Sequence, residues 1–313
     1  MTALAFVFPG QGSQSVGMLA DAHAAWPEVA ATFTEASDAL GFDLWAMACE
    51  GPAETLALTA NTQPLILTAS VALFRAWRAQ GGAMPAVAAG HSLGEFSALV
   101  AAKSLNFSDA VKLVRRRGQA MQEAVPVGKG AMAAIIGLDD AVINAICADL
   151  TTGDDHVVLA VNYNSPGQVV IAGHTDAVDQ ATVALKEAGA KRALPLPVSA
   201  PFHTPLMIHA GNVLAEALES ITVADPIIPV ISNVDAQPQQ SGAAIAELLV
   251  RQVSAPVQWT QCVQTMIDRG CSQFVECGPG KVLSGLVKRI DKSTSCYSVE
   301  TPDAFAATSE ALS

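Results

Sequence analysis

Residues 86–100 read AVAAGHSLGEFSALV, a stretch that changes from strand-like to helix-like character within a few residues. Ala86–Ala89 is a short apolar run typical of a buried strand, and Glu95–Ala102 has helical character. Between them lies Gly90-His91-Ser92-Leu93-Gly94, a G-x-S-x-G sequence. At such a turn the serine adopts a strained, exposed conformation, and glycines stand where side chains would collide. The stretch therefore predicts an α/β fold with Ser92 as a nucleophile; a chance match in a loop is the alternative.

Strand and helix patterns alternate on both sides of this turn. Ala3–Phe8 is an apolar run ended by a Pro-Gly pair, which predicts a buried strand. Gln63–Gln80 predicts a helix with Pro64 near its N-terminus. Pro226–Ser232 and Gln273–Cys277 are further strand-like runs. The alternation favours a mostly parallel sheet with helices on both faces.

The pattern changes between about Gly128 and Ser199. Four strand-like runs occur there, AMAAIIG, HVVLAVNY, QVVIAG and RALPLPV, with helical stretches at Asp139–Leu150 and Thr175–Ala188. The order βαββαβ is that of a ferredoxin-like module. We therefore predict a discontinuous large α/β domain, residues 1–127 and 198–313, with a small ferredoxin-like domain, residues 128–197, inserted into it.

Composition excludes several classes of function. The 313 residues include 17 basic and 29 acidic side chains, a formal net charge of −12, which argues against binding to the phosphate backbone of nucleic acids. We find no apolar run long enough for a membrane span and no basic N-terminal region of a signal peptide. The six cysteines form neither a CxxC pair nor a metal-ligand spacing, which indicates reduced thiols in the cytoplasm and no metal site.

A serine hydroxyl is a weak nucleophile until a base takes its proton. Of the six histidines, His203 follows a strand–loop signal C-terminal to Ser92 and is the candidate base; an ordinary loop histidine is the alternative. Because no aspartate between the two stands out at a strand end, we expect a Ser–His dyad whose imidazole is oriented by a backbone carbonyl or an amide. The N–H of Leu93 can stabilise an oxyanion, and Gln11, in the turn after the first strand, can reach the same edge.

Arg117 occupies an unusual position for a charged residue. Leu105–Glu123 predicts an amphipathic helix with Ser108 or Asp109 as its N-cap, and Arg117 falls in the middle of the apolar face. An unpaired buried charge is strongly destabilising, so the guanidinium needs an anionic partner. That partner is either an internal Asp or Glu, or a substrate carboxylate held in a bidentate clamp.

Several segments spread over the chain together resemble one known family. They are FPGQGSQ (Phe8–Gln14), TQP (Thr62–Pro64), GHSLGEFSALV (Gly90–Val100), RRRGQAM (Arg115–Met121), NSPGQVVIAG (Asn164–Gly173), the PFH around His203, RQVSAPVQW (Arg251–Trp259) and ECGPGKVLSGL (Glu276–Leu286). The chain resembles the malonyl-CoA:acyl-carrier-protein transacylases of bacterial fatty-acid synthesis, which share ancestry with polyketide synthase acyltransferase domains. The resemblance implies a hydrolase-like α/β domain with a ferredoxin-like insertion, in agreement with the patterns above.

The resemblance also implies an activity. The malonyl group of malonyl-CoA would pass to Ser92 and then to the phosphopantetheine thiol of acyl carrier protein, in a ping-pong reaction that supplies fatty-acid elongation. His203 would be the base, and Gln11 and the amide of Leu93 would line the oxyanion hole. No tightly bound cofactor is implied, and malonyl-CoA and holo acyl carrier protein would be the substrates.

The remaining implied roles concern substrate binding. Arg117 would pair with the malonyl carboxylate, and Gln252 would help position His203 in place of a triad acid. Gln63 and Asn162 are further candidates for lining the cleft. Phe202, just before His203, is the residue type found in malonyl-selecting polyketide domains, whereas related free-standing enzymes often have a small residue there.

Acyl carrier proteins are acidic, so docking on this acidic chain requires a local basic patch. The cations that cluster in sequence are Lys191, Arg192, Lys281, Lys288 and Arg289. We expect a monomer that binds the carrier transiently. Three alternatives remain: a serine thioesterase or esterase on the same elbow, which would release free acid steadily without an acceptor; a malonyl transferase that serves a polyketide pathway; and a non-catalytic carrier-binding module, which would form no adduct at Ser92.

Overall fold

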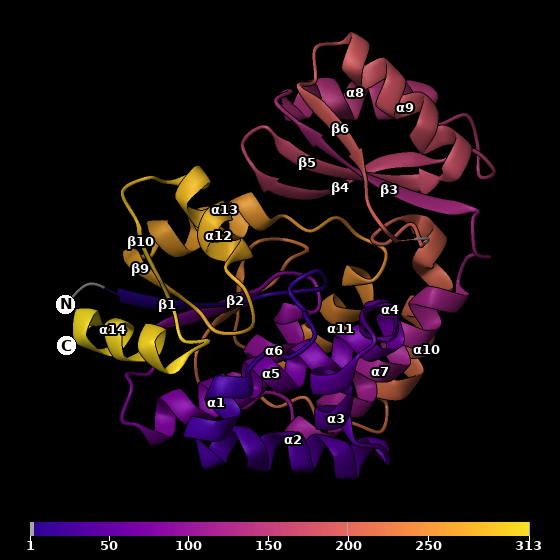
Figure 1. The fold of residues 1–313 in the computed structure, drawn as a ribbon. Helices are drawn as coiled ribbons and strands as arrows, with labels where there is room; N and C mark the ends of the chain where they lie inside the picture. Colours follow the sequence, from indigo (N-terminus) through magenta and orange to yellow (C-terminus); the bar gives the residue numbers. More distant parts are fainter. Residues whose placement is uncertain (1–2, 199, 313) are drawn as a thin grey trace.

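A computed structural model describes residues 3–198 and 200–312, and in it the chain forms two separate sheets (Figure 1). The larger sheet has the strand order β10-β9-β1-β2-β7-β8. Its strands are β1 (Ala3–Phe8), β2 (Val87–Gly90), β7 (Val230–Ile231), β8 (Pro238–Gln239), β9 (Cys271–Glu276) and β10 (Ser295–Ser298). β1 pairs in parallel with β2 and β9, β9 with β10, and β2 with β7, while β8 pairs antiparallel with β7. The predicted mostly parallel α/β fold is confirmed.

Helices cover both faces of this sheet. Phe6 and Phe8 of β1 pack into the core on one face, and the alternate residues Ala5 and Val7 pack into the core on the other. The first face is covered by α5 (Thr59–Ala79) and α6 (Gly94–Ala101), and the second by α12 (Trp259–Asp268) and α13 (Val282–Ile290) (Figure 1). Two further helices, α2 (Pro27–Leu40) and α7 (Phe107–Glu123), pack against α5. Burying each phenylalanine side chain contributes roughly 1.5–3 kcal/mol to the free energy of folding. Packing of helices on both faces therefore stabilises the large sheet.

The remaining helices of the larger part lie around these layers. They are α1 (Ala20–Ala25), α3 (Leu44–Glu50), α4 (Ala53–Ala57), the short 3-10 helix Pro205–Met207, α10 (Ile208–Leu218), α11 (Gly242–Gln252) and α14 (Pro302–Leu312). Among the described residues, no helix combines the length and the apolar content that crossing a bilayer requires.

The smaller sheet has the strand order β4-β5-β3-β6, with antiparallel neighbours. Its strands are β3 (Gly130–Ile136), β4 (Val158–Ser165), β5 (Gln168–His174) and β6 (Arg192–Pro195), and with α8 (Asp140–Leu150) and α9 (Thr175–Glu187) they follow the predicted order βαββαβ. Ala133 and Ile135 pack into a core with α8 and α9, while Met132 faces the main core. All four strands lie within the predicted insertion 128–197; its boundaries stay a prediction, and Ser199 in the predicted exit segment lies outside the described residues.

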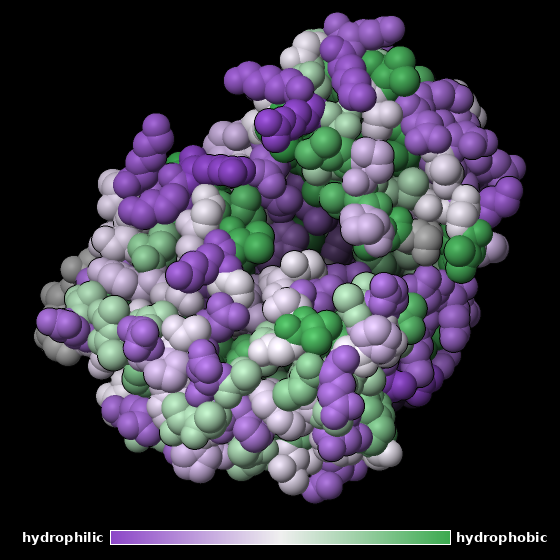
Figure 2. Space-filling view, in the orientation of Figure 1, coloured by the Kyte–Doolittle hydropathy of each residue, from purple (hydrophilic) through white to green (hydrophobic). Residues whose placement is uncertain are grey.

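Backbone hydrogen bonds join the two parts. The N–H of Val257 donates to the carbonyl of Val161 at 2.8 Å, and the N–H of Tyr163 donates to the carbonyl of Val257 at 3.0 Å. Asn162 of β4 is thereby bridged in parallel to Val257, just before α12. Figure 2 shows the surface hollowed where the small sheet meets the larger part. The small sheet is thus fixed beside the carboxyl ends of the large sheet's strands.

Two local predictions were wrong. α5 begins at Thr59, four residues before the predicted start, so Pro64 lies inside the helix, where it lacks an N–H to donate. The N-cap of α7 is Asn106 rather than Ser108 or Asp109, because its Oδ1 accepts the N–H of Ser108 at 3.0 Å and of Asp109 at 3.3 Å.

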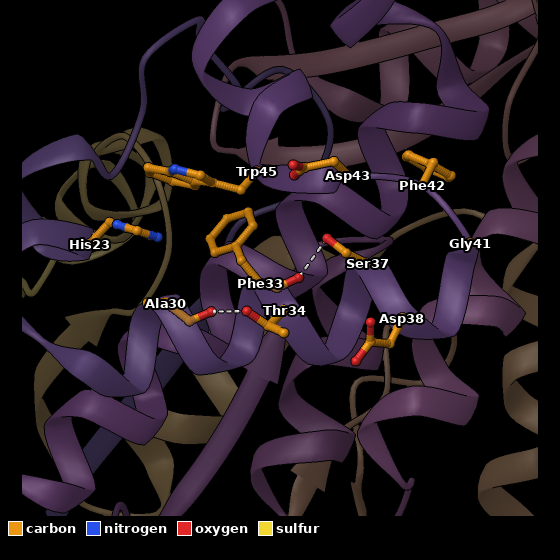
Figure 3. Close-up of a pocket in the computed structure, with 10 residues that line it drawn as sticks. All are labelled: His23, Ala30, Phe33, Thr34, Ser37, Asp38, Gly41, Phe42, Asp43 and Trp45. Carbon is orange, nitrogen blue, oxygen red and sulfur yellow. Dashed lines mark hydrogen bonds between the residues drawn. The ribbon is translucent and has the colours of Figure 1, made fainter.

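A groove of about 650 Å³ lies between α1, α2 and α3. Figure 3 shows Phe33 and Trp45 on its wall, and His23 stacks on Trp45 with ring centroids 3.9 Å apart. Its lining includes Thr34 and Asp38 but none of the residues predicted for the active site. Cavity size alone therefore does not locate the chemistry of this protein.

We expect Gly94→Ala to destabilise the fold. A Cβ at Gly94 would lie 2.0 Å from the carbonyl oxygen of Phe8, so β1 and α6 would have to separate. Overpacking of this kind costs about 1–3 kcal/mol, which thermal unfolding followed by circular dichroism would detect. Gly285→Ala is the control, since nothing lies within 4 Å of its Cβ position in α13. Equal melting temperatures for the two variants would contradict the expectation.

Candidate active site

Ser92 lies at a tight turn between β2 and α6. Its φ of 51° is in the left-handed region, which costs a residue other than glycine about 1–2 kcal/mol. A Cβ on Gly90 would lie 1.9 Å from the backbone of Gly94, so the predicted need for glycines here is confirmed. The N–H of Leu93 lies at the N-terminus of α6, where helix donors are left without intrahelical partners.

Asn233 stabilises this turn and was missed in the sequence. Its Oδ1 accepts the N–H of Ser92 at 2.6 Å, and its Nδ2 donates to the carbonyl of Gly90 at 2.7 Å. Both side-chain groups of Asn233 thus hold the strained backbone in place. The signal was available: Asn233 directly follows the predicted strand Pro226–Ser232, at the sheet edge where parallel strands end.

His203 reaches Ser92 from a distant part of the chain, as predicted. Its Nε2 lies 2.8 Å from Oγ of Ser92, and its Nδ1 lies 2.8 Å from the carbonyl oxygen of Gln252. Because a carbonyl can only accept, Nδ1 carries the proton and Nε2 is the free acceptor that faces the serine hydroxyl. Burial, reinforced by the charge of Arg117, lowers the pKa of His203 to about 3, so the imidazole is neutral at pH 7.

Arg117 is 1% exposed and lies beside the same serine. Its Nη1 donates to Oε1 of Gln63 at 2.8 Å, and its Nη2 donates to Oε1 of Gln252 at 2.9 Å and lies 3.4 Å from Oγ of Ser92. Its Nε is buried without a hydrogen-bond partner among the described residues. Burial lowers the pKa of Arg117 to about 10, so the guanidinium keeps its charge at pH 7.

The internal acid considered as a partner for Arg117 makes no direct contact with it. Within the described part of the chain, no ion pair within 4.0 Å includes Arg117. Glu95, 3% exposed, lies one contact further on, because its Oε2 accepts Nε2 of Gln252 at 2.7 Å and the N–H of Asn233 at 3.0 Å. Burial raises the pKa of Glu95 to about 7. Glu95 lies inside the quoted stretch 86–100, yet its partners are remote in the sequence: Asn233 follows β7, and Gln252 is the last residue of α11. No local pattern therefore revealed these contacts.

A cavity of about 120 Å³ brings the predicted residues together. That is roughly the space of four water molecules, enough for a small acyl group. Gln11, whose Nε2 donates to Oγ1 of Thr59 at 3.3 Å, lines it, as does Asn162, whose Oδ1 is buried without a partner among the described residues. The other lining residues include Gln63, His91, Ser92, Leu93, Arg117, Phe202 and His203, with Gln252 fully buried behind them.

His91 has a structural contact beside the elbow. Its Nε2 lies 2.8 Å from Oδ1 of Asn164 in β4, so this contact also joins the two sheets next to the nucleophile. Burial lowers the pKa of His91 and favours its neutral form. The imidazole of His91 thus contacts β4, and it is His203 whose ring nitrogen faces Oγ of Ser92.

A serine and a neutral imidazole at a strand–helix elbow can form and break an acyl ester. Residues 5–302 match the family described as "Acyl transferase domain", so the chain is an acyl transferase. It is 57% identical to the malonyl CoA-acyl carrier protein transacylase of Escherichia coli (strain K12), over 99% of this chain and 100% of that protein. It is 45% identical to the protein of that name from Bacillus subtilis (strain 168), over 97% and 95% of the two chains. The chain belongs to the malonyl CoA-acyl carrier protein transacylase family.

Solved structures support the same conclusion. The transacylase from Coxiella burnetii matches with a TM-score of 0.97 at 48% identity, over 99% of this chain and 98% of that one. A malonyl-transacylase solved in complex with a type II polyketide-synthase acyl-carrier protein matches with a TM-score of 0.97 at 51% identity, over 99% and 100%. The predicted fold class and family are confirmed.

Proposed function

We propose that this chain transfers the malonyl group of malonyl-CoA to the phosphopantetheine thiol of acyl carrier protein and so supplies fatty-acid elongation. The observation that carries the proposal is the position of Oγ of Ser92, 2.8 Å from a neutral imidazole nitrogen and 3.4 Å from a buried guanidinium nitrogen. A nucleophile, its base and a cation suited to a carboxylate thus share one small cavity. The names of the relatives support malonyl-CoA as donor and acyl carrier protein as acceptor.

In the first half-reaction, Oγ of Ser92 attacks the thioester carbon as Nε2 of His203 takes its proton. The carbonyl oxygen becomes negative, and the N–H of Leu93 with the side-chain amide of Gln11 would donate to it. The C–S bond then breaks, and the proton passes from His203 to the sulfur of CoA. The product is a malonyl ester on Ser92.

The second half-reaction reverses these steps with a different thiol. His203 takes the proton of the phosphopantetheine thiol, whose sulfur attacks the ester carbon. The bond to Oγ of Ser92 breaks, and the serine recovers its proton from the imidazole. Water must be kept from the ester carbon while the ester exists, because hydrolysis would lose the malonyl group.

Arg117 would select the acyl group through its charge. The partnerless Nε and the adjacent Nη2 offer two donors to a malonyl carboxylate. Once paired, the guanidinium opposes protonation of His203 less, so the bound carboxylate also makes the base stronger. Gln252 would hold the imidazole, and Gln63 and Asn162 would complete the lining around the substrate.

Polyketide carriers are a second candidate acceptor. One solved relative is described in complex with a type II polyketide-synthase acyl-carrier protein. The chemistry at Ser92 would be the same with either carrier, since both present a phosphopantetheine thiol.

The cytoplasmic location, the monomeric state and the lack of a bound cofactor stay predictions from the sequence.

The five clustered cations would form the docking surface for the carrier. Arg289 donates from Nη1 to Oε1 of Gln168, and Ile136 pairs in the small sheet with both Gln168 and Arg192. Because neighbouring strands lie about 4.8 Å apart, Gln168 and Arg192 are about 10 Å apart at one end of this sheet. This arrangement supports one patch that spans both parts and consists of Lys191, Arg192, Lys281, Lys288 and Arg289, all exposed.

Intact mass spectrometry tests the reaction type. We expect mixing with malonyl-CoA to add one malonyl group, and holo acyl carrier protein to remove it and carry it away. Ser92→Ala should show no adduct. Steady release of free malonate without an acceptor would instead identify a thioesterase, and a wild-type chain that never gains the adduct would identify a non-catalytic module.

Arg117→Ala tests acyl selection. Because the variant lacks the cation that pairs with malonate, we expect malonyl transfer to fall at least about tenfold, the equivalent of roughly 1.4 kcal/mol, while acetyl transfer is kept or gained. Rates of Ser92 acylation from malonyl-CoA and acetyl-CoA measure both effects. Arg115→Ala on the same helix is the control, since Arg115 donates to Asn61 outside the cavity. An equal loss for both acyl groups would contradict the clamp.

Charge reversal tests the docking patch. We expect replacement of Lys281, Lys288 and Arg289 by Glu to raise the KM for acyl carrier protein about tenfold or more at low salt, because the carrier is acidic, and to leave acylation by malonyl-CoA little changed. The control reverses three exposed cations outside the patch, Lys103, Lys112 and Lys186. If both triple variants had the wild-type KM, the carrier would dock elsewhere.

A further inference from the structure

The buried carboxylate of Glu95 is not used in the steps above, yet it is connected to Arg117 through one amide. Gln252 accepts from Nη2 of Arg117 with its Oε1, at 2.9 Å, and donates to Oε2 of Glu95 with its Nε2, at 2.7 Å. The positive end of this amide thus faces the anion, and the negative end faces the cation. All three side chains are at most 3% exposed.

We propose that Glu95 is a positioning residue that supplies the counter-charge of Arg117 while no acyl group is bound, and that it takes up a proton when a substrate carboxylate pairs with Arg117. This inference rests on the proposed role of Arg117 as the partner of the malonyl carboxylate. It makes Glu95 a second group that affects acyl selection, because its carboxylate competes with the malonyl carboxylate for the charge of Arg117.

The counter-charge follows from the cost of burial. A guanidinium removed from water is strongly destabilising unless an anion compensates it, and no acid lies in direct contact with Arg117 among the described residues. The opposed charges of Glu95 and Arg117 stabilise each other's ionised forms. They also fix the amide of Gln252 in one orientation, which places Nε2 at 3.0 Å from the carbonyl oxygen of Ser92. The charge of Glu95 therefore contributes to the position of the elbow.

The proton uptake follows from counting charges. When a malonyl carboxylate reaches Arg117, two buried anions share one cation, and the substrate has the direct contact. Burial already raises the pKa of Glu95 to about 7, so a modest further rise is enough to neutralise it near pH 7.

Other titratable groups around Glu95 do not supply this charge change. His203 and His91 are kept neutral by burial, and burial raises the pKa of Cys262 on α12 well above its ordinary value, so its thiol also stays neutral. Asp235, in the turn after β7, is an exposed carboxylate of the same sign as Glu95, and it raises the pKa of Glu95 further. Arg117 is the cation that faces this group.

The test measures half-saturation of single-turnover acylation at several pH values. The probes are the malonyl and acetyl thioesters of N-acetylcysteamine, which lack the titrating phosphates of CoA. For the wild type we expect the half-saturating malonyl concentration to rise about tenfold from about pH 6 to about pH 8. This is the ratio expected when one group with a pKa near 7, here Glu95, must be protonated for the malonyl group to bind. The acetyl probe should show no such rise.

Glu95→Gln removes the charge but keeps an acceptor oxygen for Gln252 and Asn233. We expect the half-saturating malonyl concentration of this variant to be the same at all pH values and close to that of the wild type at low pH. Compared with the wild type at about pH 8, the maximal rate should change less than the half-saturating concentration. The control is Glu276→Gln: Glu276 is equally buried and accepts the N–H groups of Leu283 and Ser284 at the start of α13, so the pH dependence should remain.

Each outcome decides the proposal. A flat malonyl profile in the wild type, the same slope with the acetyl probe, or an unchanged slope in Glu95→Gln would overturn it. If Glu95→Gln does not fold, the comparison of the two probes on the wild type decides alone. Arg117→Ala separates the two proposals. If this variant keeps the half-saturating malonyl concentration of the wild type, the role of Arg117 is refuted. If the variant needs more malonyl thioester for half-saturation but the wild type shows no pH dependence, only the role of Glu95 is refuted.

Discussion

The contacts of Gln252 hold the site together. As the last residue of α11, it has a backbone carbonyl that no later turn of the helix uses, and this oxygen accepts Nδ1–H of His203. Its side-chain amide contacts Arg117, Glu95 and the backbone of Ser92. A helix C-terminus carries partial negative charge, so it orients the imidazole and favours its protonated form, the two tasks of the acid in a serine triad. One residue therefore contacts Ser92, His203 and Arg117, the three groups to which the proposed reaction assigns nucleophile, base and cation.

The positive charge of Arg117 dominates the electrostatics of the cleft. In a cavity lined largely by apolar side chains and amides, the positive charge of Arg117 attracts an anion strongly, because a side chain that is 1% exposed is screened less than one on the surface. The same charge disfavours an imidazolium nearby. In the proposed reaction, an acyl group that brings a carboxylate would therefore be favoured twice, in its binding and in activation of His203 as the base. Selection of the acyl group and catalysis would then depend on the charge of one side chain, Arg117.

The sequence revealed the parts of this site that have a local signature. The glycines around Ser92, the apolar face that carries Arg117 and the βαββαβ order each leave a pattern within a short window, and the structure contains all three. The pairing of Ser92 with His203 was also expected, in part from the position of His203 after a strand and in part from the family resemblance.

The contacts that were missed depend on tertiary structure. Asn233 and Gln252 reach the elbow only because β7 and α11 are brought beside it. The end of the predicted strand Pro226–Ser232 indicated where Asn233 lies, but no spacing in the sequence showed its contacts with Ser92 and Glu95. The early start of α5 is similar: the expected start at Gln63, just before Pro64, follows local rules, but Thr59, Thr62 and Gln63 are all buried in the folded chain. Packing therefore overrides the local preference there.

The backbone bonds between Val257 and β4, with the contact between His91 and Asn164, cross-link both walls of the cleft beside the nucleophile. Separating the two walls beside Ser92 would break these hydrogen bonds, so they oppose a widening of the cleft there. Malonyl-CoA and holo acyl carrier protein have one part in common, the phosphopantetheine arm that ends in the sulfur atom. The cavity at Ser92, about 120 Å³, is far smaller than either molecule, so only the acyl-bearing end of that arm would enter it.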